Sequence, residues 1–312
     1  DANVMLGRLN GESLLAGRMK IKKELSIKCI NKLANELKVG SDEAALGIVK
    51  VSCATMVKAI RSISVERGYN PSDFLLFVYG GAGALHANEV ARDLGMKKII
   101  IPPSPGILCA EGAMNAPLST EYVSTILIGL DETGMETIRQ SVNTLNEKVD
   151  LWYKNESVPI SERKSWCTVG ARYYGQNYEL SLPIDLTKTD DMLVFDITSE
   201  FHKAHEANYG FASTSERIQV VNVAVKAIAD LDVPTLPKAV IAEEVKPKSF
   251  RSTLFELGSR YDTPVYERSE LVAEQIIKGP AIVEQMDTTI LIFPNDVGLV
   301  DGWGNLIISL SE

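Results

Sequence analysis

The chain has 312 residues, of which 45% are hydrophobic, 23% charged and 7% aromatic, and its formal net charge is −9. This length can form two domains with a sizeable core, and this composition is typical of a globular protein. The negative charge argues against a nucleic-acid partner, and no apolar run approaches the ~20 residues that a membrane-spanning helix needs.

The N-terminal part of the chain is predicted to form two helices. Apolar residues recur along one helical face from Ile27 to Leu37, and Gly40 ends this first helix. Ser41 is a suitable N-cap for the second helix, whose apolar stripe continues until close to Gly68.

The next segment is predicted to form a strand, a glycine turn, a helix and a second strand. The apolar run Phe74–Tyr79 is too short for a stable helix and predicts a buried strand. Gly80, Gly81 and Gly83 follow it, and the helix that starts near Ala84 ends at Gly95. A buried strand over residues 99–101 then completes the unit, in which the two strands should be parallel.

The rest of the chain is predicted to be rich in strands. Two helices are expected there, over residues 132–155 and within 190–209, and a hairpin or bulged strand around Gly175. The strand-like segments cover residues 119–130, 166–184, 217–230, 252–257, 281–285, 289–293 and 306–310. We place a domain boundary near residues 120–130 and expect the C-terminal half to be a sandwich or barrel-like module.

The glycine turn is the first candidate binding site. A turn without side chains exposes the first amides of the following helix, which suit an anion or the flat face of a nucleotide. No Lys follows Gly83, so the segment is not a P-loop, and it lacks the further glycine of a dinucleotide fingerprint. The alternative is that the glycines only let the strand and the helix pack closely.

A few side chains could carry chemistry. His86 lies in the first turn of the helix, where the positive helix end should keep it neutral, so it could donate a hydrogen bond or act in catalysis. His202 and His205 have a spacing that could bind a metal, but no third ligand is evident and the metal ligands stay unknown. Cys29, Cys53, Cys109 and Cys167 form no CxxC pair, which indicates free thiols and a cytoplasmic protein.

Several segments, in chain order, resemble the hydantoinase A / 5-oxoprolinase / acetone carboxylase family. They are Asp1–Leu9, Val65–Phe74, Tyr79–Ala87, Pro102–Gly112, Tyr174–Leu180, His205 with Tyr209 and Gly210, Gly279–Glu284, Asp287–Thr289, and Asp301 with Gly304–Leu306. The resemblance covers essentially the whole chain. The family's usual turn has Pro at the position of Ala84, a departure that leaves a better helix former there.

The resemblance implies a fold of the α/β class (α+β overall). Residues 1–125 would form the C-terminal part of an actin/sugar-kinase-like (ASKHA) nucleotide-binding core, and residues 126–312 a smaller β-rich domain with helices. The family cleaves ATP, with Mg²⁺ or another divalent cation, to activate an unreactive carbonyl. Gly80, Gly81 and Gly83 would then lie against the adenosine end of the nucleotide.

The same resemblance implies that the chain is a C-terminal fragment or one chain of a split protein, inactive alone. Its partners would be the missing N-terminal lobe, a B-type hydantoinase subunit and a small cyclic amide such as hydantoin, N-methylhydantoin or 5-oxoproline, with no nucleic acid and no membrane. Two alternatives stay open: an acetone-carboxylase-type subunit that carboxylates a ketone, and a non-catalytic module that docks a partner subunit.

Overall fold

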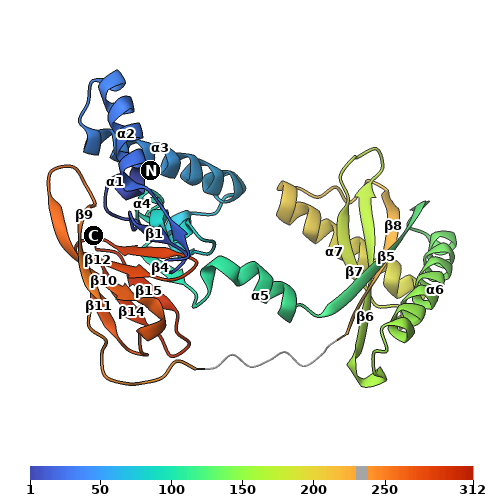
Figure 1. Cartoon of the computed structure of the whole chain (residues 1–312). Coiled ribbons are helices and arrows are strands. Elements are labelled where there is room, and N and C mark those ends of the chain that lie inside the picture. The colour runs from blue at the N-terminus through green and yellow to red at the C-terminus, as the bar shows by residue number, and fades with distance from the viewer. Residues whose placement is uncertain (230–237, 312) are drawn as a thin grey trace. The chain divides into compact units, whose positions relative to one another are not determined.

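The computed structural model describes residues 1–229 and 238–311 (Figure 1). These residues form two compact units. The split unit comprises residues 1–114 and 238–311, and the inserted unit comprises residues 115–229. The division expected at residues 125 and 126 therefore differs from the observed one, because the C-terminal strands complete a sheet begun near residue 76.

Helices of the split unit come from its N-terminal part. They are α1 (Ala2–Met5), α2 (Lys23–Leu37), α3 (Ser41–Ile63), α4 (Gly83–Asp93) and α5 (Leu108–Asn115). The predicted apolar stripes of α2 and α3 contribute to the core, where Ile30, Val49 and Cys53 are buried, whereas Leu37 at the end of the first stripe is exposed. The short hairpin β1 (Ser13–Leu14) and β2 (Met19–Lys20) connects α1 with α2. Short 3-10 turns occupy Val65–Arg67, Pro71–Asp73, Pro105–Ile107 and Arg268–Glu270.

Among the described residues, the split unit holds a five-stranded sheet with the order β11-β14-β15-β4-β3. Its strands are β3 (Leu76–Phe77), β4 (Lys98–Ile101), β11 (Ile276–Lys278), β14 (Val297–Val300) and β15 (Leu306–Ser309). The predicted parallel pairing is confirmed, since β3 runs parallel to β4. β15 pairs antiparallel with β4, which brings residues some two hundred positions apart side by side (Figure 1).

A four-stranded sheet of the split unit has the order β13-β12-β10-β9. Its strands are β9 (Ser249–Leu254), β10 (Arg260–Glu267), β12 (Ala281–Glu284) and β13 (Thr289–Ile292). Helix α4 packs against both β13 and β4, and Asn88 on α4 donates a hydrogen bond to the carbonyl oxygen of Leu291 at 2.7 Å. This helix therefore ties the glycine turn to the C-terminal strands.

The inserted unit is an antiparallel sheet covered by two long helices. Its strands, in the order β5-β8-β6-β7, are β5 (Leu118–Gly129), β8 (Ile218–Ala229), β6 (Arg163–Tyr173) and β7 (Leu180–Ile184). The helices α6 (Glu132–Asn155) and α7 (Asp190–Tyr209) share one apolar core with this sheet, and a 3-10 turn covers Ile160–Glu162. The predicted hairpin around Gly175 is confirmed by the pairing of β6 with β7.

Two expectations are corrected by this arrangement. The C-terminal half is not one sandwich or barrel, because its strands are divided between the two units. The run Phe74–Tyr79 is not a buried strand, since only residues 76–77 pair and β3 is the edge of its sheet. Of this run Val78 is buried, whereas Phe77 is about half exposed. The fold class is confirmed as mixed helix and sheet.

Candidate functional site

The glycine turn joins β3 to α4, and each glycine has a different surrounding. Gly80 has a φ of +86°, which favours glycine, and its N–H donates to the carbonyl oxygen of Pro105 at 2.6 Å. A Cβ at Gly83 would lie 3.0 Å from the Val78 side chain, so Gly83 allows the helix to approach the strand. Gly81 is exposed, and a Cβ there would lie 3.0 Å from the carbonyl oxygen of Asp287.

A cavity of about 550 Å³ opens beside Gly81 within the split unit. Residues between 9 and 17, from the segment that includes the β1 hairpin, form one wall. Residues 284–289, at the turn between β12 and β13, form another, and Gly81, Ala82 and Leu85 close the third side. This volume lies within the range of small-molecule sites. Gly81 of the glycine turn thus borders a cavity, and ligand binding by the turn stays a prediction.

One hydrogen bond joins the β12–β13 turn to the glycine turn, and a second joins it to the 3-10 turn at Pro105–Ile107. The Thr288 hydroxyl donates to the carbonyl oxygen of Gly81 at 3.1 Å, and the Gly106 N–H donates to Asp287 Oδ2 at 2.7 Å. A methyl group at residue 106 would overlap the Asp287 side chain. The close approach of these segments therefore requires a glycine at residue 106.

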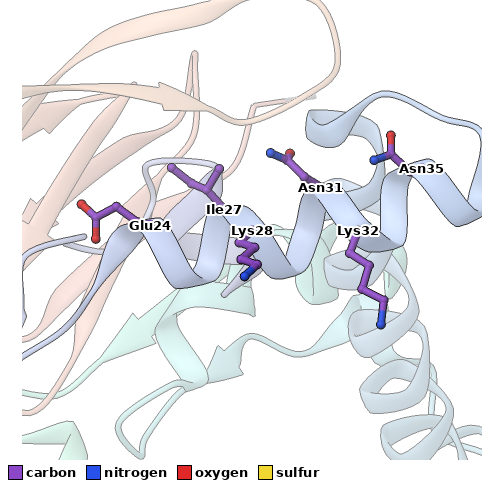
Figure 2. A pocket seen from close by; sticks show the side chains of 6 residues that line it. All are labelled: Glu24, Ile27, Lys28, Asn31, Lys32 and Asn35. Atoms are coloured by element: carbon purple, nitrogen blue, oxygen red, sulfur yellow. The ribbon is translucent and has the colours of Figure 1, made fainter.

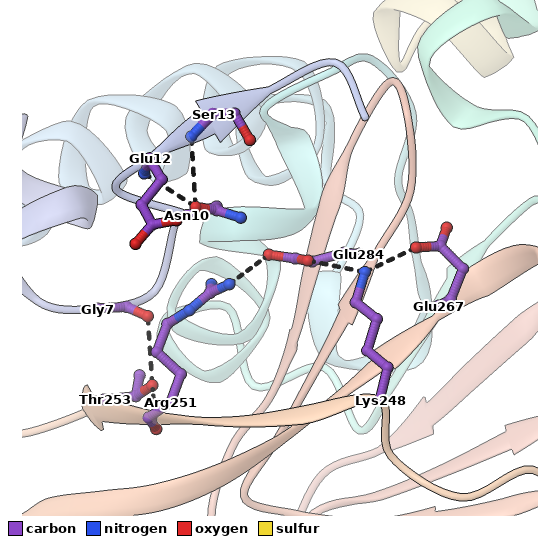
Figure 3. A network of polar contacts seen from close by, with 9 residues as sticks. All are labelled: Gly7, Asn10, Glu12, Ser13, Lys248, Arg251, Thr253, Glu267 and Glu284. Atoms are coloured by element: carbon purple, nitrogen blue, oxygen red, sulfur yellow. Dashed lines mark hydrogen bonds and ion pairs between the residues drawn. The ribbon is translucent and has the colours of Figure 1, made fainter. Parts of the chain in front are cut away.

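A charged network lines the cavity (Figure 3). Glu284 accepts from Arg251 at 2.6 Å and lies 3.0 Å from the Lys248 ammonium, which also contacts Glu267 at 2.7 Å. Burial alone would raise the pKa of Glu284, but hydrogen bonds and charge from Arg251 and Lys248 outweigh it and lower the pKa. Burial would lower the pKa of Lys248, yet its bonds to Glu267 and Glu284 raise it. Glu284 and Lys248 are therefore both charged at neutral pH.

The Thr289 hydroxyl adds a polar group to the lining of this cavity. The residue is only 8% exposed and lines the cavity. In the part of the chain that the structure describes, its hydroxyl forms no hydrogen bond. A bound ligand with a donor or an acceptor could form a hydrogen bond with this hydroxyl.

His86 lies next to Cys53 and does not line the cavity. Its Nδ1 lies 3.7 Å from Sγ of the buried Cys53 on α3, and it is not among the residues that line the cavity. The pKa of His86 is lowered as predicted, although burial, and not the helix end, is the largest cause. Burial and the nearby Glu89 charge raise the pKa of the Cys53 thiol to about 12. A catalytic role for His86 stays a prediction.

The other histidines serve packing in the inserted unit. Nδ1 of His205 lies 2.8 Å from the carbonyl oxygen of Phe211, and Nδ1 of His202 lies 2.8 Å from the Tyr173 hydroxyl. Among the described residues, no group of three or more His, Cys, Asp or Glu side chains could hold a metal ion. The described cysteines are free thiols, as the sequence predicts, and no described helix has the length and apolarity to cross a bilayer.

A second hollow, also of about 550 Å³, lies on α2 (Figure 2). Side chains of this one helix line it, among them Glu24, Lys28 and Lys32. It lacks a second wall from another element and has no buried polar group aimed into it. We therefore place the candidate site at the cavity beside Gly81.

Several cavity residues escaped the sequence reasoning. Lys248 lies in a segment for which the sequence predicts no helix or strand, and Glu267 lies in β10, a strand that the sequence did not predict. The parallel pairing of β10 with β12 places Glu267 beside Glu284, a long-range relationship that local patterns do not encode. The one available signal was the family resemblance of residues 279–284 and 287–289.

Comparison with known proteins places this chain in a family. The family model described as hydantoinase/oxoprolinase matches residues 1–122, and the model described as the hydantoinase/oxoprolinase C-terminal domain matches residues 131–310. An uncharacterised protein of Methanocaldococcus jannaschii is 38% identical over 99% of this chain, which spans 44% of that protein. Caprolactamase subunit alpha of Pseudomonas jessenii is 30% identical over 94% of this chain, which spans 43% of that subunit.

Proteins of lower sequence identity match the chain over nearly its whole length. The 5-oxoprolinase of Dictyostelium discoideum is 28% identical over 95% of this chain, which spans 24% of that protein. The crystal structure of the ATP-dependent caprolactamase from Pseudomonas jessenii matches with a TM-score of 0.81 and 28% identity, over 100% of this chain and 46% of that one. Acetone carboxylase in its nucleotide-free form shares the fold, with a TM-score of 0.82 at 21% identity, over 98% of this chain and 45% of that one. The chain belongs to the hydantoinase/oxoprolinase family and spans less than half the length of the relatives that it matches.

Proposed function

We propose that this chain is part of an ATP-dependent enzyme that opens a cyclic amide, and that the cavity beside Gly81 holds the nucleoside end of ATP. The cavity next to an exposed glycine turn is the observation that carries this proposal. Membership of the family, and similarity to an ATP-dependent caprolactamase and to a 5-oxoprolinase, support it. The cyclic amide would be of the hydantoin or 5-oxoproline type.

The charges of the cavity favour the nucleoside over the phosphates. Lys248 is already held by Glu267 and Glu284, and Asp287 adds another carboxylate nearby. This acidic lining would repel a triphosphate. An adenosine, by contrast, is uncharged and could pack on the bare backbone of Gly81 while Thr289 supplies a hydrogen bond. Gly80 and Gly83 would contribute by shaping the turn.

ATP would supply a phosphoryl group that turns an amide oxygen into a good leaving group. The contribution of this chain would be to bind and orient the nucleoside. The ligands of Mg²⁺ and the groups that meet the γ-phosphate would come from the remainder of the protein or from a B-type partner subunit. The free thiols support a cytoplasmic location.

Calorimetric titration of residues 1–312 with ATP and with adenosine tests the proposal. We expect similar affinities for the two, and a loss of about tenfold for both with Gly81→Leu, which fills the cavity wall. The matched control is Gly112→Leu, where a side chain meets open space. Nanomolar ATP binding with turnover by this chain alone would overturn the proposal that the chain supplies only part of the ATP site. Unchanged binding by Gly81→Leu would favour the non-catalytic docking module.

The substrate class needs the full-length protein. Hydantoin, 5-oxoproline and caprolactam, each with ATP, should give ring-opened product, and acetone with bicarbonate should not. Carboxylation of the ketone without ring opening would establish the alternative of a carboxylase subunit.

A further inference from the structure

The five-stranded sheet of the split unit is apolar on both faces. Residues that are directly opposite on neighbouring strands lie on the same face of a sheet. The inner face carries a row that contributes to the main core: Leu76, Ile99, Ile308, Gly298 and Ile277. The outer face carries a second row, which we call the outer row: Phe77, Ile100, Ile307, Leu299 and Ile276. One apolar residue from every strand thus meets its neighbours across the whole sheet.

The outer row is open to solvent. Phe77 is 48% exposed, Leu299 is 40% exposed and Ile276 is 52% exposed, while Ile100 and Ile307 in the middle are partly exposed. Scattered exposed apolar residues are normal, but a continuous apolar surface on a soluble unit marks an interaction site. All-parallel sheets are covered by helices on both faces, whereas antiparallel sheets commonly leave one face to solvent with polar side chains on it. An apolar row on the open face of this mixed sheet therefore departs from the usual pattern. Helix α4 contacts β4 of this sheet, and the outer face lacks a layer of helices among the described parts of the split unit.

Lysines flank the outer row on two different strands. The neighbouring row consists of Lys98, Ser309, Val297 and Lys278, in that order across the sheet. Lys98 and Lys278 are exposed, and neither forms an ion pair with any described residue. In a chain of net charge −9, these two cations leave a basic border beside an apolar surface.

The two lysines beside the outer row indicate what kind of partner would bind there. Two copies of net charge −9 repel each other, which disfavours a second copy of this chain as the occupant. A segment that has carboxylates beside an apolar stripe would pair with both lysines and bury the outer row. We propose that the outer row is the docking surface for an amphipathic helix of another polypeptide, with Asp or Glu residues along its border.

Fluorescence anisotropy with a labelled probe peptide tests this inference. The probe is an amphipathic helix of about 18 residues with Leu and Ile on one face and Glu on both borders of that face. The comparison peptide has Lys in place of each Glu. We expect the chain to bind the Glu peptide about tenfold more tightly than the Lys peptide, and this difference should shrink as salt is raised.

Two variants of the full chain locate the binding. Ile276→Gln with Leu299→Gln should weaken binding of the Glu peptide about tenfold, whereas Ile160→Gln, at an 82% exposed position in the inserted unit, should not. Lys98→Glu with Lys278→Glu changes only exposed side chains and should reverse the preference between the peptides. Equal binding of both peptides, an equal loss with Ile160→Gln, or a dimer in sedimentation that Leu299→Gln dissociates would each overturn the proposal.

Discussion

Arg8 and Glu89 form an ion pair of 2.6 Å in which the guanidinium is completely buried. Arg8 also donates to the carbonyl oxygens of Leu254 at 3.0 Å and of Phe255 at 2.6 Å. One side chain from the N-terminal segment thus joins α4 to the end of β9. The helix that follows the glycine turn is held in place by residues far from it in sequence.

Replacement of this arginine should be strongly destabilising. Arg8→Met leaves the Glu89 carboxylate without its counter-ion, and loss of one partner of a buried pair costs about 3–5 kcal/mol. Denaturation by urea should show this loss, while Arg217→Met, at an exposed arginine whose side chain forms no hydrogen bond or ion pair in the described residues, should stay within about 0.5 kcal/mol of the parent. A similar small effect for both variants would contradict the structural role of the pair.

The stability of the split unit should depend on the protonation of His86. Burial lowers the pKa of His86 in the folded state, so the unfolded state takes up a proton first as the pH falls. The contribution of the neutral His86 side chain to the free energy of unfolding is fully present above the ordinary histidine pKa of about 6.5. This contribution is lost as the pH falls through the pKa of His86 in the folded state. His86→Asn should therefore flatten the decline in unfolding free energy between about pH 7.5 and 5.5. His202 and His205 are present in both proteins, so an unchanged slope would refute this assignment.

Cys53 should resist alkylation. Burial, with help from the Glu89 charge, raises the pKa of its thiol to about 12, and the thiolate is the reactive form. Mass spectrometry after iodoacetamide treatment at about pH 8 should find Cys29 and Cys109, which are exposed, labelled well before Cys53. In denaturant, Cys53 should be alkylated as fast as Cys29 and Cys109. Early modification of Cys53 in the folded protein would argue that its contact with His86 activates the thiol.

Glu284 should support the cavity wall and the stability of the fold above acidic pH. Its pKa is lowered in the folded state, because Arg251 and Lys248 outweigh the opposite effect of burial. Its contribution is present above the ordinary carboxyl pKa and is lost as the pH falls through the folded value. Glu284→Gln should cost about 2 kcal/mol at neutral pH, and the cost should shrink below about pH 4. A cost that does not change with pH would point to packing instead of charge.

Gly106 should be intolerant of a side chain only while Asp287 is present. Gly106→Ala puts a methyl group into the Asp287 side chain and should cost about 1–3 kcal/mol. In an Asp287→Gly background the same change should cost markedly less, so a double-mutant cycle measures the clash. Gly112→Ala, in a helix with open space around it, should be neutral or stabilising by up to about 1 kcal/mol. Additive costs at 106 and 287 would show that another contact is responsible.

Local patterns were sufficient for the central part of the fold. The order of strand, glycine turn, helix and second strand around residues 76–101 follows from apolar runs and glycines, and so does the hairpin of β6 and β7, although the first strand is shorter and more exposed than predicted. They missed β10, which contains Pro264, and the short strands β11 and β14, the second of which contains Gly298. Proline and glycine are poor strand formers, and these strands exist because long-range pairing compensates for weak local preference.

The candidate site was predictable only in part. Gly81 could be named from the sequence because a bare turn before a helix is a local feature. Lys248 and Glu284 could not be placed with it, since they reach the cavity through the pairing of β9, β10 and β12. His86 shows a further limit: a helical position gives a face, but the neighbour on that face, here Cys53, depends on tertiary packing.

The pairing of β15 with β4 also governs the order in which this polypeptide can fold during synthesis. The inserted unit is continuous in sequence, so it has all its strands once Ala229 has left the ribosome. The split unit must wait for Leu306–Ser309, and its earlier helices and the apolar surface of β4 stay uncovered until then. Chaperone demand should therefore fall on the N-terminal segment for the time needed to translate some two hundred residues, about 10–40 s at ordinary elongation rates.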